Sequence, residues 1–217
     1  MNNYPAPWNL EGYGYILLYR FDTNFANKQA PDFLKKKAIP GFGSVMLVNY
    51  ETSNCGPYGE LLIIPGKYDH HNDKLHTISK IYVSSQDSVN NGRINWGIPK
   101  EHAHFNFETL PGRLEKVTIT SSGSPDSKPI FEATFKSGRI PFPVNTSLLP
   151  FPLVQQYHNK EYRTTFKGKG TGRLATMVDL TINPEMFPGI DSIKPIAVIQ
   201  VSPFNITFPV AHISKTD

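Results

Sequence analysis

The chain has 217 residues, a formal net charge of +4 at pH 7 and one cysteine, Cys55. Its 39% hydrophobic and 18% charged residues exclude an intrinsically disordered chain, and a single cysteine excludes an intramolecular disulfide. A chain of this length is long enough to bury a sizeable core, so we predict a single domain over residues 1–217.

The basic residues do not gather into a nucleic-acid-binding surface. Apart from Lys35-Lys36-Lys37 they are spread along the chain, whereas single-strand binders need basic grooves interleaved with stacking aromatic side chains. The sequence also shows neither a signal segment nor an apolar run of transmembrane length. We therefore expect no nucleic-acid or membrane partner and a cytoplasmic location.

Alternating apolar residues and a high β-branched content predict strands along most of the chain. Breakers such as Pro65-Gly66, Pro111-Gly112 and the segment 122–126 separate them. The predicted strands lie near residues 13–20, 44–50, 60–68, 75–83, 101–108, 115–121, 129–136, 159–167, 172–182 and 195–210.

Two short helices are predicted between these strands. The first lies near residues 31–38, because Pro31 suits a first helical position and Asp32 complements the positive end of the helix dipole. The second lies near residues 85–93, with Ser84 or Ser85 as its N-cap and Gly97 allowing the chain to turn back.

Two segments are predicted to be irregular. Residues 140–152 carry four prolines, which lack the donor that a sheet ladder needs, so we expect a covering loop or an edge. The glycine-rich run at residues 168–173 lacks the order of a phosphate-binding loop and is interpreted as a hairpin or a flexible turn.

Together, the predicted elements indicate an α+β fold that is predominantly antiparallel β. Closure of such a sheet into a barrel would remove exposed edges and leave an interior mouth for a small ligand. The sequence shows no internal repeat and no low-complexity tract.

The segment from Asn91 to His102 places one amine at a rigid junction. Proline fixes its own φ angle, so the backbone just before Lys100 is stiff at Pro99, and Ile98 is pushed towards extended geometry. A helix should therefore end near Gly92 to Trp96, and a strand should begin near Pro99. That arrangement can aim Lys100 into a pocket.

The pattern Gly92-Arg93-x-x-x-Gly97-x-Pro99-Lys100 resembles the segment that carries the reactive lysine of the acetoacetate decarboxylase superfamily. Gly56-Pro57-Tyr58-Gly59-Glu60 is similar to the Tyr-x-Glu strand of that family, and Pro7-Trp8 through Arg20 resembles the N-terminal strand of its uncharacterised members. The resemblance covers about residues 5–110. It implies a cone-shaped β-barrel, Lys100 as a Schiff-base amine and Glu60 as an active-site carboxylate.

Three positions depart from the family pattern. Glu101 stands where the founding decarboxylases have a second lysine, the arginine that engages the substrate carboxylate is replaced near Gly12, and a further acid aligns near Val45 or Met46. A second cation is one way in which such an enzyme activates its lysine. We therefore expect Schiff-base chemistry on a carbonyl compound other than acetoacetate.

Strand alternation would place Lys100, His102 and His104 on one face. The two histidines are interpreted either as proton shuttles beside the amine or as ordinary strand residues bonded to their neighbours. A zinc site is a third interpretation, with Glu60, His70, His71 or His76 supplying the missing ligand, although no metal motif supports it.

The prediction is therefore a small-molecule lyase that acts on a keto compound by aldol, retro-aldol, dehydration or decarboxylation chemistry, with no cofactor or metal. Two alternatives stay open: an isomerase or cyclase without a Schiff base, and a non-catalytic binding protein. Homo-oligomerisation is possible for such a fold. Arg93 is expected to pair with a backbone carbonyl at the helix end. The predicted site consists of the catalytic residues Lys100 and Glu60 and the substrate-binding residues His102, His104, Tyr58, Arg20, Trp96 and Tyr82.

Overall fold

The computed structural model describes residues 2–121, 128–148 and 150–216. The predicted turn at 122–126 lies outside these residues. The described elements are β1 (Trp8–Tyr19), α1 (Thr23–Gln29), a 3-10 turn (Asp32–Leu34), β2 (Ala38–Ile39), β3 (Gly43–Thr52), β4 (Tyr58–Ile64), β5 (Lys67–His70), β6 (Asp73–His76), β7 (Lys80–Val83), α2 (Gln86–Trp96), β8 (Lys100–Leu110), β9 (Leu114–Ser121), β10 (Phe131–Asn145), a second 3-10 turn (Thr146–Leu148), β11 (Leu153–Tyr157), β12 (Lys160–Thr164), β13 (Lys167–Ile182), β14 (Ala197–Phe208) and β15 (His212–Lys215).

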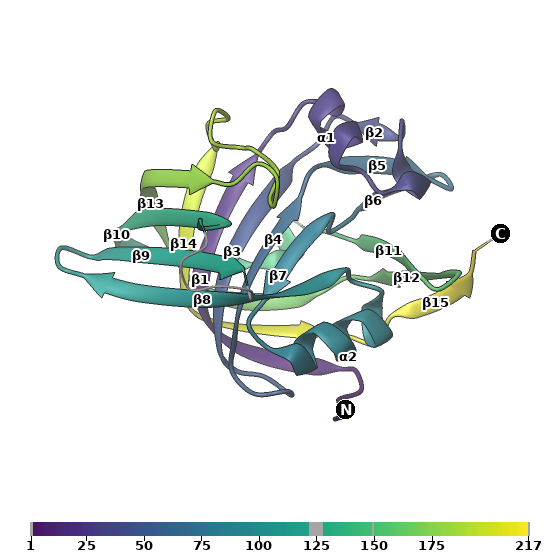
Figure 1. Ribbon diagram of the computed structural model, residues 1–217, viewed down its shortest axis with the longest axis horizontal. Coiled ribbons are helices and arrows are strands. Elements are labelled where there is room, and N and C mark those ends of the chain that lie inside the picture. Colours follow the sequence, from purple (N-terminus) through teal and green to yellow (C-terminus); the bar gives the residue numbers. More distant parts are fainter. Residues whose placement is uncertain (1, 122–127, 149, 217) are drawn as a thin grey trace.

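These strands form a closed barrel and a second sheet (Figure 1). The barrel order is β1-β14-β13-β10-β9-β8-β7-β4-β3, and the second sheet has the order β15-β12-β11-β6-β5-β2. Nearly all pairs are antiparallel; the exceptions are β7 with β8 and a single bridge between β11 and β6. The predicted α+β, predominantly antiparallel barrel with short helices is confirmed.

The parallel pair β7 and β8 positions the lysine. Parallel neighbours need a crossover connection, and here that connection is α2, which packs beside both strands (Figure 1). Lys100 opens β8 directly after α2. Because the crossover is short, the helix and the first residue of the strand are held side by side.

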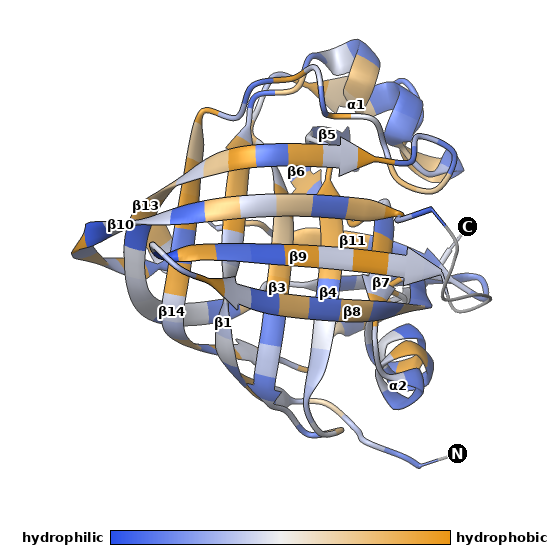
Figure 2. Cartoon of the chain, turned by 60° about the vertical axis from the view of Figure 1, so that its left-hand side comes forward, coloured by the Kyte–Doolittle hydropathy of each residue, from blue (hydrophilic) through white to orange (hydrophobic). Residues whose placement is uncertain are grey.

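Two apolar clusters lie on opposite faces of the barrel strands, as β4 shows. Leu62 and Ile64 belong to the first core, together with Trp96 of α2, whereas Leu61 and Ile63 belong to the second core. Every residue of β4 is buried, as expected of a strand covered on both faces. Hydrophobic and hydrophilic segments alternate along many of the strands (Figure 2).

The helix predicted at 31–38 was wrong in place and length. The helix α1 spans Thr23–Gln29, and only a 3-10 turn follows at Asp32–Leu34. Asp22 caps α1 by accepting a hydrogen bond from the Phe25 N–H at 2.7 Å. Ala30 is extended, at ψ 140°, because the residue before a proline avoids helical geometry. Pro31 therefore ends a helix instead of starting one.

The second predicted helix is present as α2, capped by Ser85 and Gly97, but it continues to Trp96, three residues beyond the predicted end. Ser85 accepts a hydrogen bond from the Ser88 N–H, and Gly97 ends α2 in the left-handed conformation with φ +65°. Its amide donates to the Arg93 carbonyl at 3.0 Å. No helix among the described residues is both long and apolar enough to span a bilayer.

The glycine-rich segment predicted as a hairpin or turn is strand instead, whereas the proline-rich segment begins as an edge strand, which is one of its two predicted alternatives. Residues 168–173 lie inside β13, and residues 140–145 extend β10 beyond its pairing with β9, which stops at Lys136. Among the described strands, this part of β10 pairs with β13 alone, so Pro141 and Pro143 lie at an edge, as expected for residues without a donor. Pairing between β10 and β13 therefore holds both segments in strand geometry, despite residues that favour turns.

Other strand boundaries also differ from the prediction. The segments predicted as strands at 60–68 and 75–83 each divide between the barrel and the second sheet, because the chain breaks at Pro65-Gly66 and again at 77–79. The strand β11, Leu153–Tyr157, follows the proline-rich segment and was not predicted.

His76 should make the fold sensitive to mild acid. It is 5% exposed, and burial lowers its pKa from 6.5 to about 4. The folded state therefore prefers neutral imidazole, so stability is retained above pH 6.5 and falls as the pH drops towards about 4. The free energy of unfolding can fall by at most about 3 kcal/mol, because each unit by which the pKa is lowered corresponds to about 1.36 kcal/mol.

Urea unfolding at pH 7.5 and pH 5 would measure this loss. His76→Leu is expected to lose less stability on acidification than the unsubstituted protein, whereas His212→Leu, at an exposed position, should retain the full loss. An equal pH dependence in all three proteins would show that His76 is not the responsible group.

Candidate functional site

Lys100 is a buried lysine held at its backbone by neighbouring groups. The residue is 4% exposed. Its N–H donates to the Ile98 carbonyl at 2.8 Å, and its carbonyl accepts from Arg93 Nε and Nη2 at 3.1 and 2.6 Å. Arg93 thus pairs with a backbone carbonyl, as predicted, but with that of the first residue of β8. The rigid loop and the guanidinium together fix where the lysine side chain begins.

Gly92 makes room for the aliphatic stem of Lys100. A Cβ atom added at Gly92 would lie 2.7 Å from Lys100 Cδ, a separation that real Cβ atoms do not tolerate. Any larger residue at this position of α2 would displace the lysine. The Gly92-to-Lys100 spacing seen in the sequence is therefore a packing requirement of the site.

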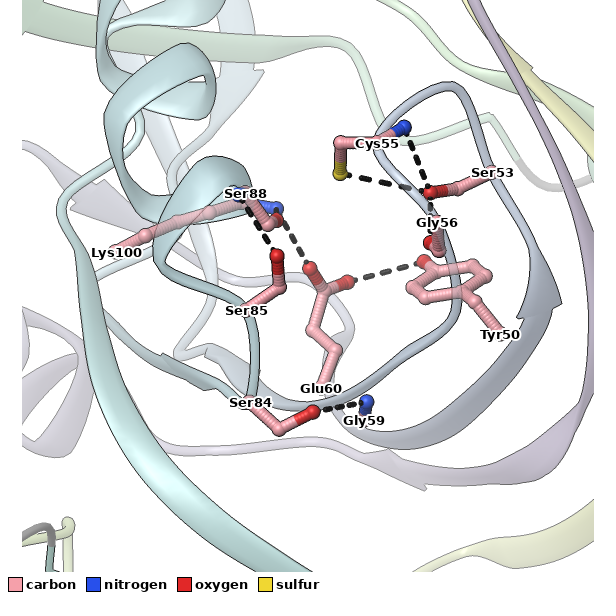
Figure 3. A network of polar contacts seen from close by, with 10 residues as sticks. All are labelled: Tyr50, Ser53, Cys55, Gly56, Gly59, Glu60, Ser84, Ser85, Ser88 and Lys100. Carbon is pink, nitrogen blue, oxygen red and sulfur yellow. Dashed lines mark hydrogen bonds and ion pairs between the residues drawn. The ribbon is translucent and has the colours of Figure 1, made fainter. Parts of the chain in front are cut away.

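Three groups lie close to the amine, and Figure 3 shows two of them, Glu60 and Ser88. Lys100 Nζ donates to Glu60 Oε2 at 2.9 Å and to Ser88 Oγ at 3.0 Å, and it lies 5.1 Å from the centre of the Tyr58 ring. Both partners of the ion pair are buried, with side chains 5% exposed. An ion pair this deep has lost most of its hydration, so each charge depends on the other.

Glu60 joins the lysine to a tyrosine. Its second oxygen, Oε1, accepts a hydrogen bond from the Tyr50 hydroxyl at 3.0 Å. Burial, and then the charge of Glu60, raise the pKa values of Tyr50 and of the neighbouring Tyr58 well above 10.0. Tyr50 therefore keeps its proton and acts as a fixed donor that orients the carboxylate.

Two cavities share Glu60 in their linings. The larger has a volume of about 70 Å³ and the smaller about 20 Å³. Lys100 lines the smaller cavity only, whereas Glu60 lines both. The residues common to the two linings are Tyr50, Glu60, Leu62, Ile78 and Phe208. The carboxylate thus stands where a molecule in the larger cavity would approach the amine.

The structure brings together four of the predicted site residues. Lys100, Glu60, Tyr58 and Trp96 all line the smaller cavity. Trp96 is fixed there by its indole N–H, which donates to the Pro209 carbonyl at 2.7 Å.

The other four predicted substrate-binding residues line neither cavity. Arg20 is exposed and lies against Phe42, and Tyr82 belongs to the second core, on the opposite face of the sheet. His102 and His104 share a face, as predicted, with ring centres 5.6 Å apart, but His104 is exposed. The burial of β8 decreases away from the lysine, so alternation alone misplaced the histidines.

Two site residues were missed by sequence reasoning. Ser88 contacts the amine and Tyr50 contacts Glu60. A signal existed for Ser88, because residues four apart lie on one helix face and Ser88 precedes Gly92 by four. Tyr50 had no local signal, since it comes from β3, which pairs with β4 only in the folded sheet.

Glu101 is directed away from the amine. It is exposed and pairs with Lys80 at 2.6 Å. The sequence departure at this position therefore places no second carboxylate beside Lys100.

A group with metal-ligand chemistry lies elsewhere, in the second sheet. His70, His71 and Glu161 have ligand atoms within 4.8 Å of one another. However, His70 Nε2 already contacts Glu161 at 2.7 Å, and two cations flank the group, Lys37 at 3.4 Å from His70 and Arg163 at 2.8 Å from Glu161. Nearby positive charge disfavours a bound cation. Among the described residues, the histidine pair of β8 forms no such group.

The chain matches a known protein family over most of its length. The sequence profile of the acetoacetate decarboxylase (ADC) family matches residues 2–180. No curated protein sequence matches the chain.

Solved structures show the same fold. An acetoacetate decarboxylase from Legionella pneumophila superposes with a TM-score of 0.75 at 14% identity, covering 99% of this chain and 90% of that one. The enduracididine biosynthesis enzyme MppR, complexed with pyruvate, gives 0.66 at 15% identity, with 96% and 90% covered. An acetoacetate decarboxylase-like enzyme from Sphingomonas wittichii gives 0.68 at 11% identity, with 98% and 94% covered.

Proposed function

Because this chain belongs to the acetoacetate decarboxylase family, we propose that it is a small-molecule enzyme in which Lys100 forms a Schiff base with a keto compound. The observation that carries the proposal is the buried contact of Lys100 Nζ with Glu60 Oε2 at 2.9 Å, beside a cavity. Lysine is rarely buried without a use. No organic cofactor is required for this chemistry.

The residues present can perform each proton transfer of imine formation. Transfer of a proton from the Lys100 ammonium to Glu60 frees the lone pair of Nζ. The amine then bonds to the carbonyl carbon while the carbonyl π electrons move to oxygen, which takes the proton back from Glu60. Glu60 then takes one proton from the nitrogen of the carbinolamine and gives it to the hydroxyl, which leaves as water as the iminium forms. Glu60, again a carboxylate, is placed to remove a proton from the α-carbon.

The iminium can serve aldol, retro-aldol, dehydration or decarboxylation reactions. The related MppR has been captured with pyruvate and with the condensation product of pyruvate and imidazole 4-carboxaldehyde. That precedent concerns MppR. For the present chain it favours carbon–carbon bond chemistry on a carbonyl substrate.

Borohydride trapping tests the proposal. The protein would be incubated with acetone, pyruvate or a longer ketone, reduced, weighed intact and digested. We expect one adduct, mapped to Lys100, because this amine is enclosed beside Glu60. An adduct only on exposed lysines, with Lys100 unmodified for every carbonyl, would overturn the Schiff-base proposal.

A second candidate function uses the same residues without an imine. Glu60 lines the larger cavity and Lys100 does not, so a ligand there meets the carboxylate first. In this case Glu60 would transfer protons in an isomerisation or cyclisation, and Lys100 would supply charge. Catalysed exchange of the α-hydrogens of a ketone with no borohydride adduct at Lys100 would favour this function.

A further inference from the structure

The larger cavity is lined almost wholly by hydrocarbon. Its walls include Val48, Leu62, Ile78, Val201, Phe204 and Phe208. Its lining includes Glu60 and Tyr50, whose side chains bond to each other. A ligand that fills this space must therefore present an apolar body to the walls.

The one cationic residue that lines this cavity among the described residues is Lys169, and its side chain is directed elsewhere. Side chains alternate along β13, and Cβ atoms added at Gly168 and Gly170 would meet Ile206 and Phe204 of the first core. The glycines thus face the core, and Lys169, between them, is exposed on the other face. Lys169 therefore lines the cavity next to Gly168, while its side-chain amine lies outside the cavity.

A carboxylate on the substrate would consequently have no partner in the larger cavity. The nearest cation, Lys100, already pairs with Glu60 and lines only the smaller cavity, and Arg20 is exposed outside the site. Burying an unpaired charge is strongly unfavourable, whereas each methylene placed in such a cavity improves binding about fourfold. Both effects favour an uncharged ligand with an apolar chain.

We propose that the substrate is a neutral ketone or aldehyde with an apolar chain, bound with the chain in the larger cavity and the carbonyl at Glu60. This inference rests on the proposed function for its chemistry, but the binding preference stands separately. A neutral carbonyl compound carries no carboxylate to lose. The reaction is therefore aldol, retro-aldol or dehydration and not decarboxylation.

Binding and labelling of a matched panel test the inference. The panel contains acetone, 2-butanone, 2-pentanone, 2-hexanone, pyruvate and 2-oxohexanoate, studied by calorimetry and then by borohydride trapping. The Kd should tighten about fourfold for each added methylene in the ketone series. 2-Oxohexanoate should bind at least about tenfold more weakly than 2-hexanone, because its carboxylate is unpaired. Equal or tighter binding of the keto acids would overturn the inference.

The calorimetric result separates this inference from the Schiff-base proposal. Tight binding of 2-hexanone without any adduct at Lys100 would support the apolar site and count against the imine. An adduct formed best with pyruvate would support the imine and count against the apolar site.

Variants at Val144 test whether the alkyl group of the ketone binds in the larger cavity. Val144 is a partly buried wall of the larger cavity and does not line the smaller one. Val144→Phe should weaken binding of 2-hexanone by about tenfold or more while acetone binding changes little, and Val144→Ala should shift the preference towards longer ketones. Leu174→Phe, at a side chain 63% exposed, is the matched control. Unchanged length dependence in both folded Val144 variants would show that the chain binds elsewhere.

Discussion

Replacing Lys100 with methionine should leave a protein that no carbonyl compound labels at the site and that is less stable by about 3–5 kcal/mol. Methionine keeps much of the length of the stem that passes Gly92 but removes the amine. Glu60 would then remain buried with Tyr50 as its partner and without a cation. Equilibrium urea unfolding and intact mass after reduction measure the two effects.

A double variant separates stability from chemistry. Replacement of both members of a buried ion pair by neutral residues is often close to neutral for stability. Lys100→Met combined with Glu60→Gln should therefore recover most of the lost stability and none of the labelling. If Lys100→Met alone is as stable as the unsubstituted protein, the ion pair is not the desolvated contact that its burial indicates.

Replacing Glu60 with glutamine should slow proton transfer by about 10²–10⁴-fold. Glutamine preserves the shape of the carboxylate and a hydrogen-bond acceptor for Tyr50, but its amide cannot take a proton at neutral pH. The measurement is the rate at which a ketone exchanges its α-hydrogens for deuterium in heavy water, followed by NMR. Glu60 is the group placed to remove that hydrogen from the iminium.

Glu101→Gln is the matched control for this experiment. It makes the same chemical change at the residue that follows Lys100 in β8, where the carboxylate is exposed and pairs with Lys80. We expect its exchange rate to stay within about twofold of the unsubstituted protein, as for most surface substitutions. A Glu60→Gln variant that exchanges as fast as Glu101→Gln would remove Glu60 from the proposed mechanism.

Family resemblance indicated Lys100 and Glu60 as residues of one site, and the structure places their side chains in contact, whereas their catalytic roles stay a prediction. Sequence reasoning placed the lysine correctly at the junction after α2, because proline, glycine and cap residues act over a few positions. The contact with Glu60 spans 40 positions, and only the resemblance indicated it. Where that guidance was missing, at Arg20 and Tyr82, alternation and strand membership could not tell which face of the barrel leads to the amine.

The histidine predictions show the same limit within a single strand. The common face of His102 and His104 follows from alternation and is present in the structure. Whether that face is covered depends on neighbouring elements, and the cover over β8 ends soon after Lys100. Within this strand of 11 residues, Lys100 is buried whereas His104, four positions later, is exposed.

By itself, the sequence determined the local features of this protein, namely the capped helix α2 and the stiff backbone at Ile98-Pro99. It also determined the predominantly antiparallel character of the fold. Tertiary structure alone decided that β10 and β13 continue through residues typical of turns, that Tyr50 orients Glu60, and that the larger cavity opens onto the carboxylate and not onto the amine. The physical reason is range. Caps and turns depend on bonds between near neighbours in the chain, whereas cavities and strand edges depend on which distant segments the closed sheet brings together.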